Sequence, residues 1–204
     1  MDYWRAIVLY GLNVATYKIA LARCLHGFVA DGKTRVTMHE LAAAFFALYL
    51  DRLQKGMPQL SNPSRLTRME TIVSRFRLGQ VTESQAIDFV EQNAFVDVVP
   101  RFHTVLDEPV PVRFYEQDRE GLILTDAAFL VFESPQAGNL RDEVDSRWDL
   151  LEAAFLIRRD NLELVNDIRK FYLQGGYPRT DVTGMIPVLN GYQKGICFYC
   201  GEPM

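Results

Sequence analysis

Apolar residues recur every three or four positions near the start of the chain, which is the spacing of one face of a helix. This spacing predicts a single long helix over residues 2–26 that ends near Gly27. Two polar residues of the segment, Asn13 and Thr16, are expected to bond to a neighbouring segment in the core. The apolar face of the predicted helix comprises Ile7, Leu12, Ala15, Ile19, Ala22 and Leu25.

Two capping boxes mark the starts of further helices. Thr37 is followed three residues later by Glu40, and Thr82 is followed at the same spacing by Gln85. In each pair the hydroxyl can accept from the later residue's backbone, while the longer side chain bonds back to the threonine N–H. Each pair therefore predicts a helix N-terminus.

The helix after the first capping box is predicted to end near Gly56, and it is apolar on nearly all sides, as in the centre of a bundle. The helix after the second capping box is predicted to run to about residue 93. A further helix is expected between them at about 67–77, and Pro100 is expected to close the helical section. Residues 1–100 are therefore predicted to form a bundle of four helical segments.

The pattern changes after residue 100, where apolar and polar residues alternate. The stretch "PVPVRFYEQDREGLILTD" predicts a β-hairpin around a polar turn at Gln117–Gly121. The stretch "DAAFLVFES" predicts a short helix, and "QAGNLRDEVDSRWDLLEAAFLIRRDN" predicts a long one capped by Asn139. A loop and a last short helix over about 184–193 follow. The apolar stripe of the long helix comprises Leu140, Val144, Trp148, Leu151 and Phe155.

The predicted fold class is mainly α: a helical bundle with a small β-hairpin insertion and a C-terminal zinc-knuckle-like turn. Three regions are expected. Residues 1–100 form the bundle, which is basic in its first 80 residues. Residues 101–183 hold the hairpin and further helices and are acidic, and residues 184–204 hold a Cys-x-x-Cys turn.

Composition narrows the protein class. A chain of 204 residues with 49% hydrophobic residues can bury a sizeable core. It has no run of about 18 apolar residues, and its N-terminal segment lacks the basic start and compact apolar block of a signal peptide. Three cysteines do not make a secreted disulfide framework. These features predict a cytoplasmic protein with no membrane partner.

The net charge of −4 conceals two regions of opposite sign. Residues 1–80 carry eleven Lys or Arg and five Asp or Glu, a net charge of +6. Residues 81–204 carry eleven basic and 21 acidic residues, a net charge of −10. One interpretation is a basic face that binds a polyanion. The other is that the two regions attract each other within one fold.

Four arginines lie close together in "NPSRLTRMETIVSRFRLG". Those at positions 68 and 75 share a helix face, and such a row can contact successive phosphates of DNA, which predicts salt-sensitive binding. A lysine of the first helix could extend the same surface. The alternative is a solvated face that pairs with the acidic region. The candidate nucleic-acid-binding residues are Arg65, Arg68, Arg75, Arg77 and Lys18.

Four acidic residues of the long predicted helix are expected to form its exposed face. They could hold Mg²⁺, but no Lys or His accompanies them at the spacing of a familiar nuclease core. These residues are Glu143, Asp145, Asp149 and Glu152.

Cys197 and Cys200 form a Cys-x-x-Cys pair followed by glycine, in which a tight turn can direct both sulfurs at one zinc ion. Tetrahedral zinc needs four ligands, so the pair is half of a site. A redox pair is the competing interpretation, but that motif precedes a helix, and no helix follows here. The other candidate ligands are interpreted as core or surface residues: Cys24, His26, His39 and His103.

The stretch "YQKGICFYCGEPM" resembles the entry to the zinc-stabilised nuclease domain of HNH endonucleases. "LYGLNVATYKIALARCL" (9–25) and "DSRWDLLEAAF" (145–155) are similar to the helical N-terminal region of bacterial proteins of this kind. The resemblance implies that Cys197 and Cys200 are the first half of a structural zinc site. It also implies a divalent metal such as Mg²⁺ at the nuclease centre of the full-length protein.

No residue of this chain matches the catalytic His-Asn-His part of that family. The resemblance therefore implies an N-terminal recognition or assembly region of a DNA endonuclease, inactive by itself, with a role in restriction or phage defence. Two rival functions stay open. Two chains could share one zinc through a Cys₄ site and form a homodimeric interaction module, and an oxidoreductase is the weaker alternative.

Overall fold

The computed structural model describes residues 2–10, 13–105, 108–166 and 202, with side chains described for all of these except Tyr10 and residues 160–166. The described chain is mainly α-helical, with two small antiparallel sheets. The helices are α1 (Asp2–Tyr10), α2 (Tyr17–Ala30), α3 (Met38–Arg52), the 3₁₀ turn η1 (Leu53–Lys55), α4 (Arg68–Arg77), α5 (Glu83–Asn93), α6 (Phe95–Arg101), α7 (Asp126–Phe132) and α8 (Ala137–Asn166). The strands are β1 (Arg35–Thr37), β2 (Thr104–Val105), β3 (Glu108–Pro109), β4 (Tyr115–Gln117) and β5 (Gly121–Leu124).

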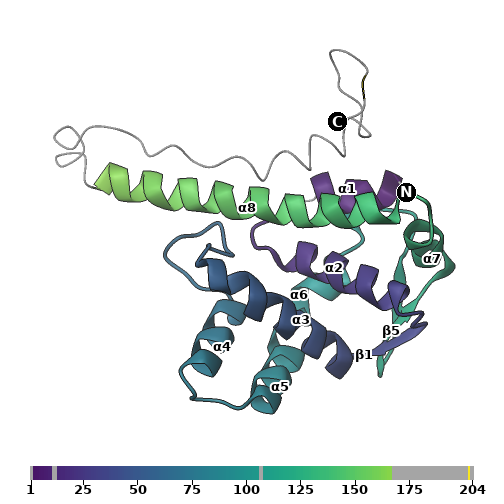
Figure 1. Cartoon of the computed structure of the whole chain (residues 1–204), viewed down its shortest axis with the longest axis horizontal. Coiled ribbons are helices and arrows are strands. Elements are labelled where there is room, and N and C mark those ends of the chain that lie inside the picture. Colours follow the sequence, from purple (N-terminus) through teal and green to yellow (C-terminus); the bar gives the residue numbers. More distant parts are fainter. Residues whose placement is uncertain (1, 11–12, 106–107, 167–201, 203–204) are drawn as a thin grey trace.

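The long helix α8 runs across one side of the molecule, with α1 and α2 packed against it (Figure 1). On the other side of α2, the helices α3, α4 and α5 pack together, and α7 lies with the β1–β5 sheet at one end. Within the described residues, no helix is long and apolar enough to cross a bilayer.

Several predicted elements are confirmed. The Thr37 and Thr82 capping boxes both form, and they open α3 and α5. Gly56 ends the α3–η1 segment in a left-handed conformation (φ 67°), which glycine adopts without the steric cost of a Cβ. The β4–β5 hairpin, α7 and the buried apolar stripe of α8 are also present.

The prediction of one continuous helix over residues 2–26 is wrong, because the helix is interrupted between α1 and α2. Backbone bonds to a distant segment replace helical ones there: Thr16 N–H donates to the Gln59 carbonyl at 3.2 Å, and Ser61 N–H donates to Val14 at 2.8 Å. Gly27 lies inside α2 and does not end it.

One helix was missed and one predicted helix start is wrong. The pattern did not predict α6, the short helix that contains Pro100 and ends the N-terminal helical section one residue later at Arg101. Asn139 is not the cap of α8, which begins at Ala137. The wrong start comes from assigning a helix boundary to a single residue type.

The β-hairpin is joined to the N-terminal bundle through β1, which pairs with β5 and places buried Val36 opposite buried Leu122. Gly121 makes this pairing possible. A Cβ added at this position would lie 2.1 Å from the Val36 carbonyl oxygen, which is well inside van der Waals contact. Residues of regions 1–100 and 101–183 thus share one three-stranded sheet.

Ion pairs also connect the basic N-terminal part to the acidic part that follows it. Arg5 binds Glu143 at 2.8 Å, and Arg23 binds Asp145 at 3.0 Å, so both tie the first two helices to α8. Arg35 of β1 contacts two carboxylates of the hairpin turn. The attraction of the two regions within one fold, one of the two interpretations of the charge pattern, is therefore present in the structure.

Arg52 makes the most buried of these pairs. Its Nε donates to Glu152 Oε1 at 2.8 Å, its Nη2 contacts Asp149, and its guanidinium lies 5.0 Å from the ring centroid of Trp148. The Glu152 carboxylate is almost completely buried. Burial raises the pKa of Glu152, while hydrogen bonding to Gln59 and the Arg52 charge act in the opposite direction.

Gln59 is fully buried and joins three elements of the core. Its Oε1 accepts from Trp148 Nε1 of α8 at 2.9 Å and from the Thr16 hydroxyl at 2.8 Å. Its Nε2 donates to Glu152 at 2.6 Å and to the Met57 carbonyl at 3.1 Å. The carbonyl oxygen and the NH₂ group of the side-chain amide are thus both satisfied in the interior, as burial requires.

Thr16 extends this network to α3. Its hydroxyl has one proton, which goes to Gln59, so the Tyr49 hydroxyl donates the 2.7 Å bond between Tyr49 and Thr16. The expectation that Thr16 bonds to a neighbouring segment in the core is confirmed. We call Gln59, Thr16, Tyr49, Trp148 and Glu152 the Gln59 network.

His103 joins α6 to the hairpin. Its Nε2 accepts the backbone N–H of Phe114 at 2.9 Å, so the proton of the neutral ring lies on Nδ1. Nearby, the Tyr115 hydroxyl donates to the Val99 carbonyl at 2.6 Å. Trp4 packs edge-on against Phe114, which places α1 against the same aromatic core.

Replacement of Arg52 should test the buried ion pair. Arg52→Ala leaves the Glu152 carboxylate buried without its cation, and we expect the free energy of unfolding to fall by about 3 kcal/mol. Lys55→Ala is the matched control. Lys55 is exposed, and its ammonium approaches Asp149 no closer than 3.9 Å, so its loss should change the free energy of unfolding little. Urea unfolding of both variants measures the difference. An equal loss of unfolding free energy in the two variants would contradict the stabilising role of the buried Arg52–Glu152 pair.

Acidification should destabilise the protein through His103. Burial, with the charges of Arg113 and Lys18, lowers the pKa of His103 from 6.5 to about 4. His103 therefore takes up a proton at a higher pH in the unfolded chain than in the folded one. The contribution of neutral His103 to the free energy of unfolding is full above about pH 6.5 and is lost as the pH falls toward 4. The expected loss is roughly 3 kcal/mol. Urea unfolding at both pH values measures this loss. The His103→Gln variant should lack the part of the pH dependence that comes from His103. If its stability depended on pH as strongly as that of the unsubstituted protein, the role of His103 would be contradicted.

Candidate functional site

A cavity of about 700 Å³ lies between the start of α2, the loop before α4, and α6. Four cationic side chains line it: Lys18 of α2, Arg65 of the loop, Arg68 at the start of α4, and Arg101 at the end of α6. One acidic residue, Asp97, is also in the lining. We call this site the basic groove.

The cations of the basic groove keep donors available. Within the described residues, Arg65 and Arg68 are exposed and make no ion pair. Lys18 donates to the Thr104 carbonyl at 2.7 Å, which uses one of its three ammonium protons, and burial lowers its pKa. Arg101 lies 3.9 Å from Asp97 with both side chains largely exposed, so this pair is weak.

Local contacts fix the walls of the groove. The Tyr17 hydroxyl accepts the Met69 N–H at 3.1 Å, which joins the start of α2 to the first turn of α4. A capping box that the sequence reading missed, Thr67 with Glu70, begins α4. Glu70 also accepts the Gln59 backbone N–H at 3.1 Å, so the loop that carries Arg65 is fixed at both ends.

Apolar groups accompany the charges. Val14 and Leu66 line the groove and are 65% and 70% exposed, although large apolar side chains are usually buried. Tyr17 and Leu60 are also in the lining. The groove can therefore contact both an anionic group and an apolar or aromatic one.

The structure brings together three of the five predicted nucleic-acid-binding residues. Lys18, Arg65 and Arg68 line the basic groove. Arg75 is exposed farther along α4 and is not in the lining. Arg77 donates to the carbonyls of Leu50 and Leu53 at 2.8 and 3.0 Å, so its guanidinium caps the C-terminal end of α3.

Arg101 was missed by sequence reasoning, because Pro100 was interpreted as the end of the helical section. The i, i+4 spacing of Asp97 and Arg101 is a helical signal on both sides of that proline and could have indicated α6. The approach of α6 to the loop before α4 depends on tertiary packing, which has no local signal in the sequence.

The expectation that the acidic residues of α8 form an exposed face is wrong for two of them. Glu143 and Glu152 are buried, with exposed fractions of 6% and 1%, because Arg5 and Arg52 bind them. Asp145 is bound by Arg23. These carboxylates join α8 to the basic helices, so they do not line an open site.

Cys197 and Cys200 lie outside the described residues. Of the other residues considered as ligands, Cys24 is buried in α2, and burial raises the pKa of its thiol to about 12, which keeps it protonated. His26 lies against the Ala137 carbonyl at 3.2 Å, and burial lowers its pKa.

Comparisons with protein-family models, with curated proteins and with solved structures gave no match for this chain.

Proposed function

We propose that the basic groove binds the phosphate backbone of DNA. The observation that carries the proposal is the gathering of Lys18, Arg65, Arg68 and Arg101 around one cavity from three separate segments of the chain. Cations that neutralise DNA phosphates release condensed counterions, so such a groove gains affinity without reading the base sequence.

The use of the other arginines supports the choice of this surface. Arg5, Arg23 and Arg52 are bound by carboxylates of α8, and Arg77 caps α3. These side chains serve the fold and leave little charge for a ligand. The loop before α4 and the start of α4 instead present arginines without an acidic partner in the described part of the chain.

The apolar lining suits a nucleotide as well as an inorganic anion. Sugar and base surfaces can pack on Tyr17, Val14 and Leu66 while phosphates meet the cations. The Asn62 carboxamide oxygen accepts the Ser64 N–H at 3.0 Å, and this leaves its amide protons for a phosphate or a base edge.

Together with the resemblance of "YQKGICFYCGEPM", the groove supports a wider proposal. The chain serves as the N-terminal recognition or assembly region of an HNH-type DNA endonuclease, with Cys197 and Cys200 as part of a structural zinc site. The chemistry of bond cleavage, with a divalent ion such as Mg²⁺, belongs to the nuclease module of that family.

Charge reversal in the groove should abolish most DNA binding. Arg65→Glu/Arg68→Glu removes two cations that face phosphates without damage to the fold, because both side chains are exposed and a glutamate suits the first turn of a helix. Fluorescence anisotropy with a labelled duplex at several salt concentrations measures affinity. We expect the affinity to fall more than about tenfold and the salt slope to decrease by about 1 for each arginine that no longer neutralises a phosphate.

Arg119→Glu/Arg113→Glu is the control with the same change in net charge, because both arginines lie around the hairpin and neither is part of the groove lining. An equal loss of DNA affinity in the two variants would show that net charge alone causes the effect, and it would contradict DNA binding at the basic groove. If DNA binds as predicted but the coding sequence after the Met204 codon lacks a His-Asn-His pattern, the groove stands and the nuclease assignment fails.

A further inference from the structure

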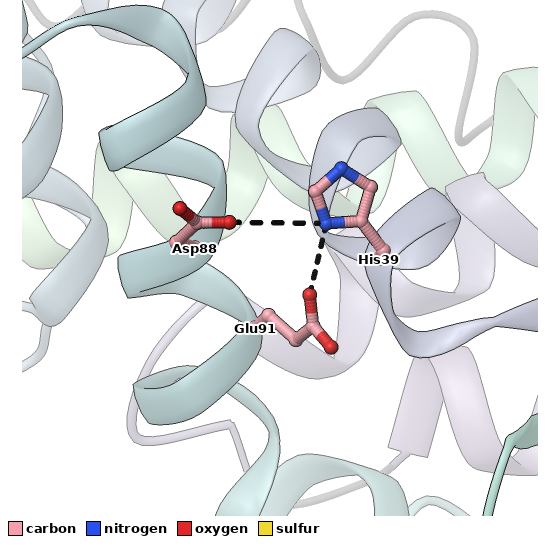
Figure 2. A group of neighbouring side chains, drawn as sticks. All are labelled: His39, Asp88 and Glu91. Atoms are coloured by element: carbon pink, nitrogen blue, oxygen red, sulfur yellow. Dashed lines mark hydrogen bonds and ion pairs between the residues drawn. The ribbon is translucent and has the colours of Figure 1, made fainter.

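His39, Asp88 and Glu91 come together on the surface where α3 packs against α5 (Figure 2). His39 Nδ1 lies 3.0 Å from Glu91 Oε2 and 4.0 Å from Asp88 Oδ1. The three potential ligand atoms all lie within 4.8 Å of one another. We call these residues the His39 cluster, and none of them lines the basic groove.

All three residues of the cluster lie on two well-packed helices, α3 and α5. His39 lies two residues after the Thr37 cap, in the first turn of α3, and the two acids are one helical turn apart on the same face of α5. The same two packed helices contribute the buried residues Ala42 and Val90 to the core. The backbone positions of the three side chains are therefore fixed by the core.

The carboxylates of the cluster have the His39 imidazole as their recorded ion-pair partner. In the part of the chain that the structure describes, neither Asp88 nor Glu91 has a lysine or arginine within ion-pairing distance. An unprotonated imidazole leaves the cluster with two negative charges. A divalent cation would neutralise both and also use the imidazole as a ligand.

The distances fit such an ion. Bonds of about 2.0–2.2 Å to zinc place neighbouring ligand atoms roughly 3–3.5 Å apart in tetrahedral or octahedral geometry. The His39–Glu91 distance is already in this range, and the Asp88 carboxylate must move closer than its present 4.0 Å from His39 Nδ1. Both partners of that longer contact are more than half exposed, so the side chains can adjust without change to the core.

We propose that the His39 cluster binds a divalent transition-metal ion of the zinc type, which joins α3 to α5. One nitrogen and two carboxylate ligands favour Zn²⁺, Co²⁺ or Ni²⁺ over Ca²⁺ and Mg²⁺, which prefer oxygen alone. Water completes the coordination, because the site is open to solvent. This proposal is independent of DNA binding.

Zinc titration of the full chain tests the site, with Cys197→Ser/Cys200→Ser as the background so that thiolates cannot bind the ion. Calorimetry should show one Zn²⁺ per chain, and thermal unfolding should shift upward with zinc, because the ion binds the folded arrangement. His39→Gln and Glu91→Gln should each weaken binding by more than about tenfold. Affinity should also fall on acidification, since the imidazole must be unprotonated.

Glu83→Gln is the control, because Glu83 is exposed on the same helix and its replacement removes the same charge. It should leave zinc affinity unchanged. Absence of binding in the background variant, or an equal effect of Glu83→Gln and Glu91→Gln, would overturn the site. Replacement of exposed side chains is not expected to unfold the protein, and thermal unfolding without zinc checks this point directly.

Discussion

The buried amide of Gln59 is the interaction on which the rest of the structure depends. It accepts from Thr16 and Trp148, donates to Glu152, and so connects the start of α2, α8 and the loop before α4. An amide in an apolar interior must have its hydrogen bonds met, because each unmet one costs the full desolvation of the group. The network therefore specifies one arrangement of these elements, and the same arrangement forms two walls of the basic groove.

The same packing decides which cationic side chains pair with carboxylates of α8 and which remain at the surface. The carboxylates of α8 bind arginines from α1, α2 and α3, so three of the eleven cationic side chains of the first 80 residues are paired within the fold. Arginines of the loop before α4 and of the first turn of α4 do not reach α8. Positive charge is thus concentrated at the groove, although the chain as a whole carries a net charge of −4.

Local signals in the sequence predicted the elements that local chemistry decides. The Thr37 and Thr82 capping boxes, the helix end near Gly56 and the apolar stripe of α8 are decided by residues close in sequence, and each appears as predicted. The break between α1 and α2 could not be predicted in this way. Residues 13–16 have helical spacing, but bonds to residues 59–61, more than forty positions away in sequence, are formed instead.

The candidate sites show the same limit. Lys18, Arg65 and Arg68 were identified from composition and spacing, whereas Arg101 joins them only through the packing of α6. His39 had no apparent partner in the sequence, because Glu91 lies 52 residues away on another helix. Clusters that draw their members from distant segments require a structure.

An amide-resolved NMR titration tests the central claim, that the Gln59 network and the α8 ion pairs leave the groove as the surface for DNA. The ¹⁵N-labelled chain is titrated with a short DNA duplex at low salt. The account predicts shift changes concentrated in residues 13–18, 60–71 and 97–101, reduced by added salt. Shifts concentrated instead on α1 and α8, around Arg5 and Arg23, or no change in the three groove segments, would contradict it.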